Sequence, residues 1–243
     1  MTKRHLVIPD SHSMPSHNND RFEWLGKFIF DLKPDVVIDI GDSADMESLC
    51  FWDKGKRGYD TRSYLDDIEC YQDAMEKLWH PFKRNKKKMP HRIKTRGNHE
   101  DRINKAVSSA GVMTGTFCID DLEEKRWNDE VSEFLYAITV DGIKYHACPS
   151  PIMGKPLASV NLARTIIKQE HCSYTVGHVH SRDFHEERGV QASVVGCYFD
   201  NHHDFAGPSN DNYWRGILVK EEVCNGKYEP HWYSLDRLRK EYG

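Results

Sequence analysis

The amino-terminal half of the chain alternates short apolar runs with segments whose apolar residues recur at helical spacing. Residues 6–8 and 35–40 are dense apolar runs that end at Asp10 and at Gly41-Asp42, which is typical of buried strands that deliver a loop. Residues 19–32 lie between them and place their apolar side chains on one helical face. A strand, a helix and a strand at this spacing predict a βαβ unit with a right-handed crossover.

This periodicity fades over residues 43–64, which we interpret as an excursion or lid. It returns over residues 64–79, which predict a helix. A charged loop at 83–88 then leads to a third predicted strand at 91–95 and to a helix over 101–109.

The second half carries hairpin signals instead. Apolar segments at 134–140 and 143–147 flank Asp141-Gly142, a strong signal for a two-residue turn. Further predicted elements are a helix over 157–169, strands over 174–176, 191–199, 216–223 and 227–232, and a final helix over 235–241. Parallel strands followed by hairpins predict a layered α/β fold with two sheets and helices outside, in a single domain of residues 1–243.

Composition narrows the classes of function. Hydrophobic residues make up 38% and charged residues 30% of the chain, but the apolar residues come in dense runs, which argues against disorder. The 34 Lys and Arg residues against 38 Asp and Glu residues give a net charge of −4, which excludes a general nucleic-acid coat. A local basic patch, formed by residues 83–88 with Arg92, Lys94 and Arg96, could still steer a polyanion, although a solvated loop is the commoner role for such a run.

Apolar stretches and cysteines indicate the compartment. No stretch approaches the 18 consecutive apolar residues of a membrane span, and the start of the chain lacks the apolar region of a secretory signal. The seven cysteines are widely spread and form no Cys-x-x-Cys pair, which is typical of reduced thiols. We therefore expect a cytoplasmic protein with no membrane partner.

Candidate chemistry lies where the predicted strands end. The clusters are Asp10-x-His12, Gly41-Asp42, Gly97-Asn98-His99-Glu100 and Gly177-His178-x-His180, with His146 as a fifth point. The carboxyl ends of strands in α/β sheets are where sites are built, and the glycines let the chain turn sharply off each strand. Carboxylates, an asparagine and imidazoles are the ligand set of a divalent transition metal.

Each cluster has an ordinary structural reading when it is taken alone. Asn98 and Glu100 could serve a helix N-terminus, and His146 could be a satisfied buried histidine. It is the ordered set, each member following a predicted strand, that favours a metal site.

Together these clusters resemble those of the calcineurin-like metallophosphoesterase superfamily, and the resemblance runs from Asp10 to His180. It implies the metallophosphoesterase-like fold, a four-layer α/β/β/α sandwich of two mixed β-sheets flanked by helices. It also implies two divalent metal ions in one cleft, with manganese expected first and iron, zinc or nickel as alternatives. The implied ligands are Asp10, His12 and His180 for the first ion, Asn98, His146 and His178 for the second, and Asp42 bridging both.

The reaction implied by this resemblance is hydrolysis of a phosphodiester or phosphomonoester by a hydroxide that bridges the metals. His99 would be the catalytic histidine that is not a ligand, protonating the leaving oxygen or stabilising phosphoryl charge. Asp45 matches a family carboxylate that orients this histidine, and a solvated loop aspartate fits the sequence equally well.

Substrate contacts rest on fewer residues. Asn98, Arg102 and His202 are candidates for binding the phosphoester, with solvated surface roles as the alternative for the last two. Trp52, Tyr59, Tyr213 and Trp214 could stack on bases or pack locally. Together with the basic run, they favour nucleotides or nucleic-acid ends as the substrate.

Departures from relatives refine this expectation. Asp45 is followed by Met46 where protein Ser/Thr phosphatases of the superfamily carry Arg, and His146 is followed by Ala147 where Gly is usual. The excursion at 43–64 is similar to that of stand-alone phosphoesterases of bacteriophages and prophages, which implies a host cytoplasm.

Two other functions remain open at the level of the sequence. One is a phosphomonoesterase or protein phosphatase. The other belongs to a different class: a metal-bound interaction scaffold without turnover, which some relatives of this fold have become after losing the catalytic histidine. The chain keeps His99 and every ligand position, which favours the enzyme.

Overall fold

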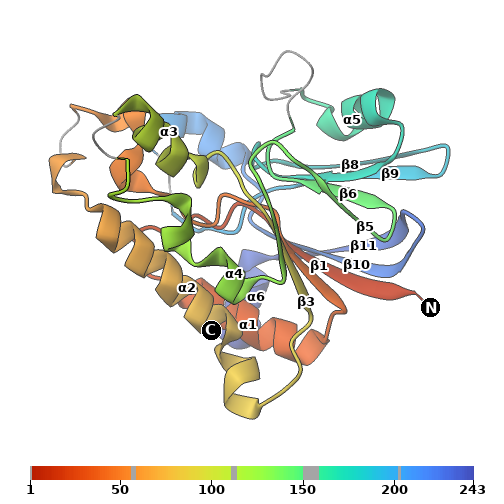
Figure 1. Ribbon diagram of the computed structural model, residues 1–243. Helices are drawn as coiled ribbons and strands as arrows, with labels where there is room; N and C mark the ends of the chain where they lie inside the picture. The colour runs from red at the N-terminus through yellow and green to blue at the C-terminus, as the bar shows by residue number, and fades with distance from the viewer. Residues whose placement is uncertain (1, 56–58, 111–113, 150–158, 202–203) are drawn as a thin grey trace.

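The computed structural model describes residues 2–55, 59–110, 114–149, 159–201 and 204–243. Two mixed β-sheets lie face to face at its centre (Figure 1). The six-stranded sheet has the order β11 (Lys227–Ser234), β10 (Gly216–Cys224), β1 (Lys3–Ile8), β2 (Val36–Asp39), β3 (His91–Thr95) and β4 (Glu130–Ser132). The five-stranded sheet has the order β5 (Ile138–Val140), β6 (Ile143–His146), β7 (Ser173–Val176), β9 (Val190–Val195) and β8 (Arg182–Glu187).

The parallel strands lie side by side in each sheet. Strands β1 to β4 are parallel to one another, as are β6, β7 and β9, and the hairpin strands pair with them antiparallel. The carboxyl ends of seven strands therefore meet along one edge of the two sheets, which is the edge where the sequence places its polar clusters.

Helices cover both outer faces. Helices α1 (Asp20–Leu32), α2 (Tyr64–Asn85) and α6 (Leu235–Tyr242) lie on the six-stranded sheet, and α5 (Leu162–Glu170) lies on the other sheet (Figure 1). Alternation along β1 explains the layers, because Leu6 and Ile8 pack under the helices while Val7 packs between the sheets. The expected four-layer α/β/β/α sandwich is confirmed.

Most predicted elements are confirmed with small shifts at their ends. The clearest error concerns α2, which continues through Pro81 to Asn85, so the predicted charged loop at 83–88 begins inside the helix. Phe82 explains the extension, because it packs against Phe30 and Trp79 in the core. Lys83 and Arg84 then lie in the last turn, where cations complement the helix dipole.

Three predicted segments change their extent. Strand β5 begins only at Ile138, β9 ends at Val195, and the helix expected over 157–169 is α5, which begins at Leu162, while residues 157 and 158 lie outside the described residues. The short edge strands β4 and β8 were not predicted, because β8 has the mostly polar sequence Arg-Asp-Phe-His-Glu-Glu.

The excursion at 43–64 has local structure where it is described. It contains three short 3₁₀ helices, η1 (Glu47–Leu49), η2 (Phe51–Asp53) and η3 (Tyr59–Thr61), and residues 56–58 lie outside the described residues. Two further elements, α3 (Asp101–Ser109) and α4 (Glu124–Trp127), follow β3. Over the described ranges, no helix is both long and apolar enough to cross a bilayer.

A lysine is buried between the two sheets. The Lys220 ammonium group donates to the Thr175 hydroxyl and lies 4.1 Å and 4.6 Å from the ring centroids of Tyr228 and Tyr145. No carboxylate forms an ion pair with it among the described residues, and burial holds the pKa of Lys220 well below its usual range.

We expect Lys220→Met to stabilise the protein at neutral pH by about 1 kcal/mol or more, because it removes a buried polar group that has no carboxylate partner among the described residues. Because burial lowers the pKa of Lys220, the folded chain binds this proton less tightly than the unfolded chain does. The penalty therefore shrinks as the pH rises towards the unfolded pKa of about 10.4. Thermal unfolding of both proteins between pH 7 and 10 measures it. A variant that is less stable at pH 7, or a difference that does not change with pH, contradicts this account.

Candidate metal centre

The loops that follow the parallel strands carry the predicted ligands to one place. Asp10 and His12 follow β1, Asp42 follows β2, and the pair His178 and His180 follows β7. Backbone hydrogen bonds join these loops, since the N–H of His12 donates to the Asp42 carbonyl at 2.9 Å and that of His178 donates to the Asp10 carboxylate at 2.7 Å.

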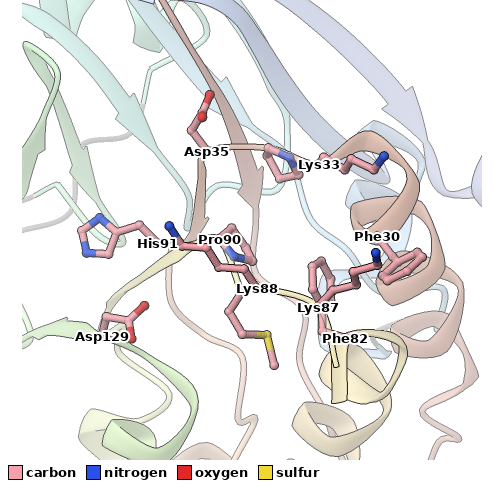
Figure 2. Close-up of a pocket in the computed structure, with 11 residues that line it drawn as sticks. Phe30, Lys33, Asp35, Phe82, Lys87, Lys88, Pro90, His91 and Asp129 are labelled. Carbon is pink, nitrogen blue, oxygen red and sulfur yellow. The ribbon is translucent and has the colours of Figure 1, made fainter. Parts of the chain in front are cut away.

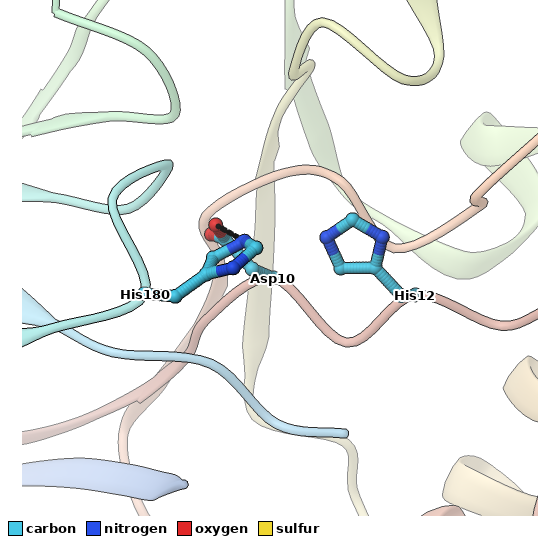
Figure 3. A group of neighbouring side chains, drawn as sticks. All are labelled: Asp10, His12 and His180. Atoms are coloured by element: carbon cyan, nitrogen blue, oxygen red, sulfur yellow. Dashed lines mark ion pairs between the residues drawn. The ribbon is translucent and has the colours of Figure 1, made fainter. Parts of the chain in front are cut away.

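Asp10, His12 and His180 lie close enough together to hold one metal ion (Figure 3). One potential ligand atom from each lies within 4.8 Å of the other two, and His180 Nε2 is 3.1 Å from Asp10 Oδ2. These three residues are the predicted ligands of the first ion. A second group at the same spacing consists of His12, Asp45 and His99.

The predicted ligands of the second ion are gathered less tightly. Asp42, His146 and His178 do not form such a group among the described residues. His146 ends β6, next to β7, and its Nδ1 lies 2.9 Å from the Tyr174 hydroxyl, which fixes the direction of the ring. Asn98 follows β3, in the turn whose next residue, His99, donates its N–H to Asp42 Oδ1 at 2.8 Å.

Backbone strain is concentrated in these ligands. Five of the seven have φ in the left-handed region, between 27° and 73°: Asp10, His12, Asp42, His178 and His180. Residues other than glycine rarely adopt such angles, at a cost of about 1–3 kcal/mol each, and they persist where the surrounding structure imposes them. The fold thus holds this backbone in a shape that local preference opposes.

Two glycines allow the close approach of the loops. A Cβ atom added at Gly97 would lie 2.0 Å from Asp42 Oδ1, and one added at Gly177 would lie 2.3 Å from Asp10 Oδ1. The glycine in each motif is therefore required because a predicted ligand carboxylate occupies the space of its side chain.

The Glu100 side chain connects the loop that follows β2 with the turn that follows β3. Its buried carboxylate accepts the backbone N–H groups of Asp42 (3.0 Å), Ser43 (2.8 Å), Ala44 (3.2 Å) and Gly97 (2.9 Å). Lys94, also fully buried, donates to the same carboxylate at 3.0 Å. Burial alone would raise the pKa of Glu100, but Lys94 and the backbone donors lower it to about 2.

These contacts correct the interpretation of three residues. Lys94 and Arg96 belong to buried ion pairs, the second with Glu124 at 2.7 Å, so neither extends a surface patch that would steer a polyanion. Glu100 makes no side-chain cap at the start of α3. For Lys94 a signal was present in the sequence, where it lies between Ile93 and Thr95 within a predicted strand.

Burial sets the charge state of the candidate ligands. It raises the pKa of Asp10 well above the usual range and also raises that of Asp42, which Asp10 and Glu100 raise further. It lowers the pKa of His146 and of His180 to about 4. A neutral imidazole can bind a metal ion without first losing a proton. A carboxylate that is buried in this way is stable in its ionised form only beside a cation.

Buried polar atoms test whether a cation fits. In the described part of the chain, Asp10 Oδ1 and Asn98 Oδ1 are buried without a hydrogen-bond partner, and His146 Nε2 has none of standard geometry. Such groups are costly unless something binds them. Buried atoms on Asn19, Tyr71, Thr95 and Glu124 also have no such partner and are not predicted ligands. The three atoms on Asp10, Asn98 and His146 differ in that they belong to predicted ligands, so the donor set fits divalent cations.

His99 lies beside this donor set with two partners. Its Nδ1 is 3.0 Å from the Asp45 carbonyl oxygen, and its Nε2 is 3.3 Å from the Arg102 guanidinium. Burial and Arg102 lower the pKa of His99, but Asp42 and Asp45 outweigh them and raise it. Arg102 also donates to the Asp45 carbonyl at 2.8 Å, so these residues form one unit.

Asp45 has a role that the sequence did not reveal. Its carboxylate makes its shortest contact with His12 Nδ1, at 2.6 Å, and lies 3.5 Å from His99 Nδ1. It therefore connects a predicted ligand with the predicted catalytic histidine. The predicted substrate residue His202 lies outside the described residues.

A cavity of about 770 Å³ lies at the opposite end of the strands (Figure 2). It opens where Asp35 precedes β2 and His91 begins β3, between Phe30 of α1 and Phe82 of α2. Its lining includes none of the predicted ligands. Size alone therefore does not identify the site, which the chemistry places at the carboxyl ends.

Comparisons with known proteins add little to this geometry. No protein-family model and no curated protein matches the chain. Among solved structures, it is similar to Vacuolar Protein Sorting 29 of Cryptosporidium parvum, with 12% identity, 96% of this chain and 97% of that chain covered, and a TM-score of 0.44.

Two other solved structures are similar to the same degree. One is a conserved uncharacterized protein of Streptococcus pneumoniae described as a predicted phosphoesterase (10% identity, 97% and 91% coverage, TM-score 0.42). The other is wild-type Vps29 of Entamoeba histolytica complexed with Zn²⁺ (14% identity, 96% and 99% coverage, TM-score 0.39).

We expect Gly97→Ala to lower the amount of manganese that the protein binds, because the added methyl group displaces the Asp42 carboxylate. Elemental analysis of dialysed protein measures the bound metal. Gly189→Ala serves as the control, since its φ is also positive but its nearest neighbour is the end of Lys227 at 3.6 Å. Equal metal content in wild type and Gly97→Ala would contradict the role of Asp42.

We expect Glu100→Gln to destabilise the protein by about 3 kcal/mol, because it leaves Lys94 charged and buried with one fewer carboxylate. The contribution of Glu100 is present above its unfolded pKa of about 4.3 and is lost as the pH falls towards 2. Urea unfolding at pH 7 measures the difference. Glu123→Gln is the matched control, because the exposed carboxylate of Glu123 pairs with the exposed Arg126 and with no other cation in the described part of the chain. An equal effect of the two substitutions would contradict this role of Glu100.

Proposed function

We propose that this chain is a phosphoesterase of the calcineurin-like metallophosphoesterase type that works with two divalent metal ions. The observation that carries this proposal is the set of buried, unsatisfied ligand atoms on Asp10, Asn98 and His146, beside a histidine that can transfer a proton. Asp10, His12 and His180 would hold one ion, Asn98, His146 and His178 the other, and Asp42 both.

A bound pair of divalent cations supplies Lewis-acid chemistry, which neutralises charge on phosphoryl oxygens and lowers the pKa of water. The side chains of this protein supply the rest. The partly accessible His99 imidazole, whose pKa is raised, holds a proton that it can donate to a leaving oxygen. Asp45 keeps the imidazole ring of His99 in place through its carbonyl and carboxylate oxygens. The Arg102 guanidinium, which lies next to His99, would bind the phosphate.

The contacts of Arg102 support its assignment to substrate. The residue after Asp45 is Met46, which is fully buried and carries no charge, so that position offers nothing to an anion. Arg102 instead comes from α3, reaches back to the Asp45 carbonyl and remains 18% exposed in its side chain. A fixed and partly exposed guanidinium is well suited to bind a phosphoryl oxygen.

We expect the manganese-loaded protein to hydrolyse bis(4-nitrophenyl) phosphate or 4-nitrophenyl phosphate, and Asp42→Asn and His99→Ala each to reduce kcat by about 10²–10⁴. Asp42→Asn removes a charge from the metal site, whereas His99→Ala removes the proton donor and leaves the ligands in place. Release of 4-nitrophenolate measures turnover.

Asp236→Asn is the control, since its carboxylate is exposed on α6. Unchanged turnover in both site variants would show that the residue assignment is wrong. Stoichiometric metal without turnover of any phosphoester would favour the scaffold.

A further inference from the structure

A second cavity adjoins the candidate metal centre and contains none of its carboxylates. It has a volume of about 520 Å³ and lies between α3 and the excursion that follows β2. Asn98 and Arg102 line it, so it opens directly beside the predicted metal ligand and the predicted phosphate-binding residue.

Its walls combine rings with positive charge. Four aromatic side chains line it, namely Phe51, Trp52, Tyr59 and Phe117. Among the described residues, the charged side chains that line it are all cations, Lys54, Arg102 and Lys105, although the chain as a whole has a net charge of −4. A ligand that is both flat and anionic complements such a surface.

Two of these aromatic rings are exposed to solvent. Trp52 is 81% exposed and Phe51 is 68% exposed, and the rings meet edge to face at a centroid distance of 5.7 Å. Exposed neighbouring aromatic side chains commonly mark a binding surface, because removing their apolar area from water is favourable. Tyr213 and Trp214, the other aromatic candidates from the sequence, do not line the cavity: Tyr213 packs on His180 and Trp214 on Trp232.

We propose that this cavity binds the nucleoside part of the substrate, so that the phosphoester is that of a nucleotide or of a nucleic-acid end. This inference rests on the proposed hydrolysis for the position of the phosphate, beside Arg102, and on the cavity itself for the base. The volume of the cavity falls within the ~300–1,000 Å³ that is typical of small-molecule sites. A ligand with a single phenyl ring would leave much of this cavity empty. Stacking on Trp52 and Phe51 would tolerate any base, because every base has a flat face.

Turnover of two matched diesters tests the proposal. Thymidine 5′-(4-nitrophenyl phosphate) and bis(4-nitrophenyl) phosphate share a leaving group and differ in the nucleoside. We expect kcat/KM to favour the thymidine ester, and Trp52→Ala to reduce this preference about tenfold, whereas Trp52→Phe retains most of it. Tyr136→Ala, which truncates an aromatic side chain that is 69% exposed and outside the lining, should leave the ratio unchanged.

Binding tests the cavity independently of hydrolysis. Calorimetric titration of the protein without added metal should show tighter binding of thymidine 5′-monophosphate than of ribose 5-phosphate, with the difference lost in Trp52→Ala. An oligothymidylate with a terminal phosphate, titrated in parallel, distinguishes a strand end from a free nucleotide according to which binds more tightly. If neither diester nor 4-nitrophenyl phosphate is hydrolysed, the proposed function is wrong, and the titration still decides whether the cavity binds the nucleoside.

Three results would overturn the proposal. They are equal binding of the nucleotide and the sugar phosphate, a preference that survives Trp52→Ala, and tighter binding of a phosphotyrosine peptide than of the nucleotide.

Discussion

The candidate site depends on a buried ion pair beneath it, between Lys94 of β3 and Glu100 at the start of α3. The Glu100 carboxylate gathers backbone N–H groups from the loop after β2 and from the turn after β3, and those loops carry Asp42, Asn98 and His99. The Lys94 ammonium group also lies 3.3 Å from Asp39, at the end of β2. One buried charge pair therefore fixes the relative position of two strands and of the ligand loops that follow them.

This constraint explains how the site sustains unfavourable local structure. The left-handed backbone of Asp10, His12 and Asp42 and the burial of their side chains oppose folding. Hydrogen bonds between the loops help to hold the chain in that shape, as the contact of the His12 N–H with the Asp42 carbonyl shows. A site held in this way is preorganised, so a bound cation would gain ligands without reordering the backbone.

The sequence predicts the layers and the location of the site because both depend on short-range patterns. The apolar run of β1 and the one-sided apolar face of α1 are local, and each polar cluster follows directly from a strand end. The partners of those clusters are not local. Glu100 binds backbone groups 56 to 58 residues away, and the link from Asp45 to His12 spans 33 residues, so neither has a sequence signature. The polar edge strand β8 was missed because its pairing with β9, rather than its own residues, makes it a strand.

Anomalous diffraction from crystals soaked in manganese tests the central claim most directly, because it locates each ion without relying on turnover. The account predicts two peaks in one cleft, the first bounded by Asp10, His12 and His180, the second by Asn98, His146 and His178, with Asp42 touching both. A single peak held by Asp45 and His99, or peaks only at the distant cavity lined by Phe30 and Phe82, would contradict it.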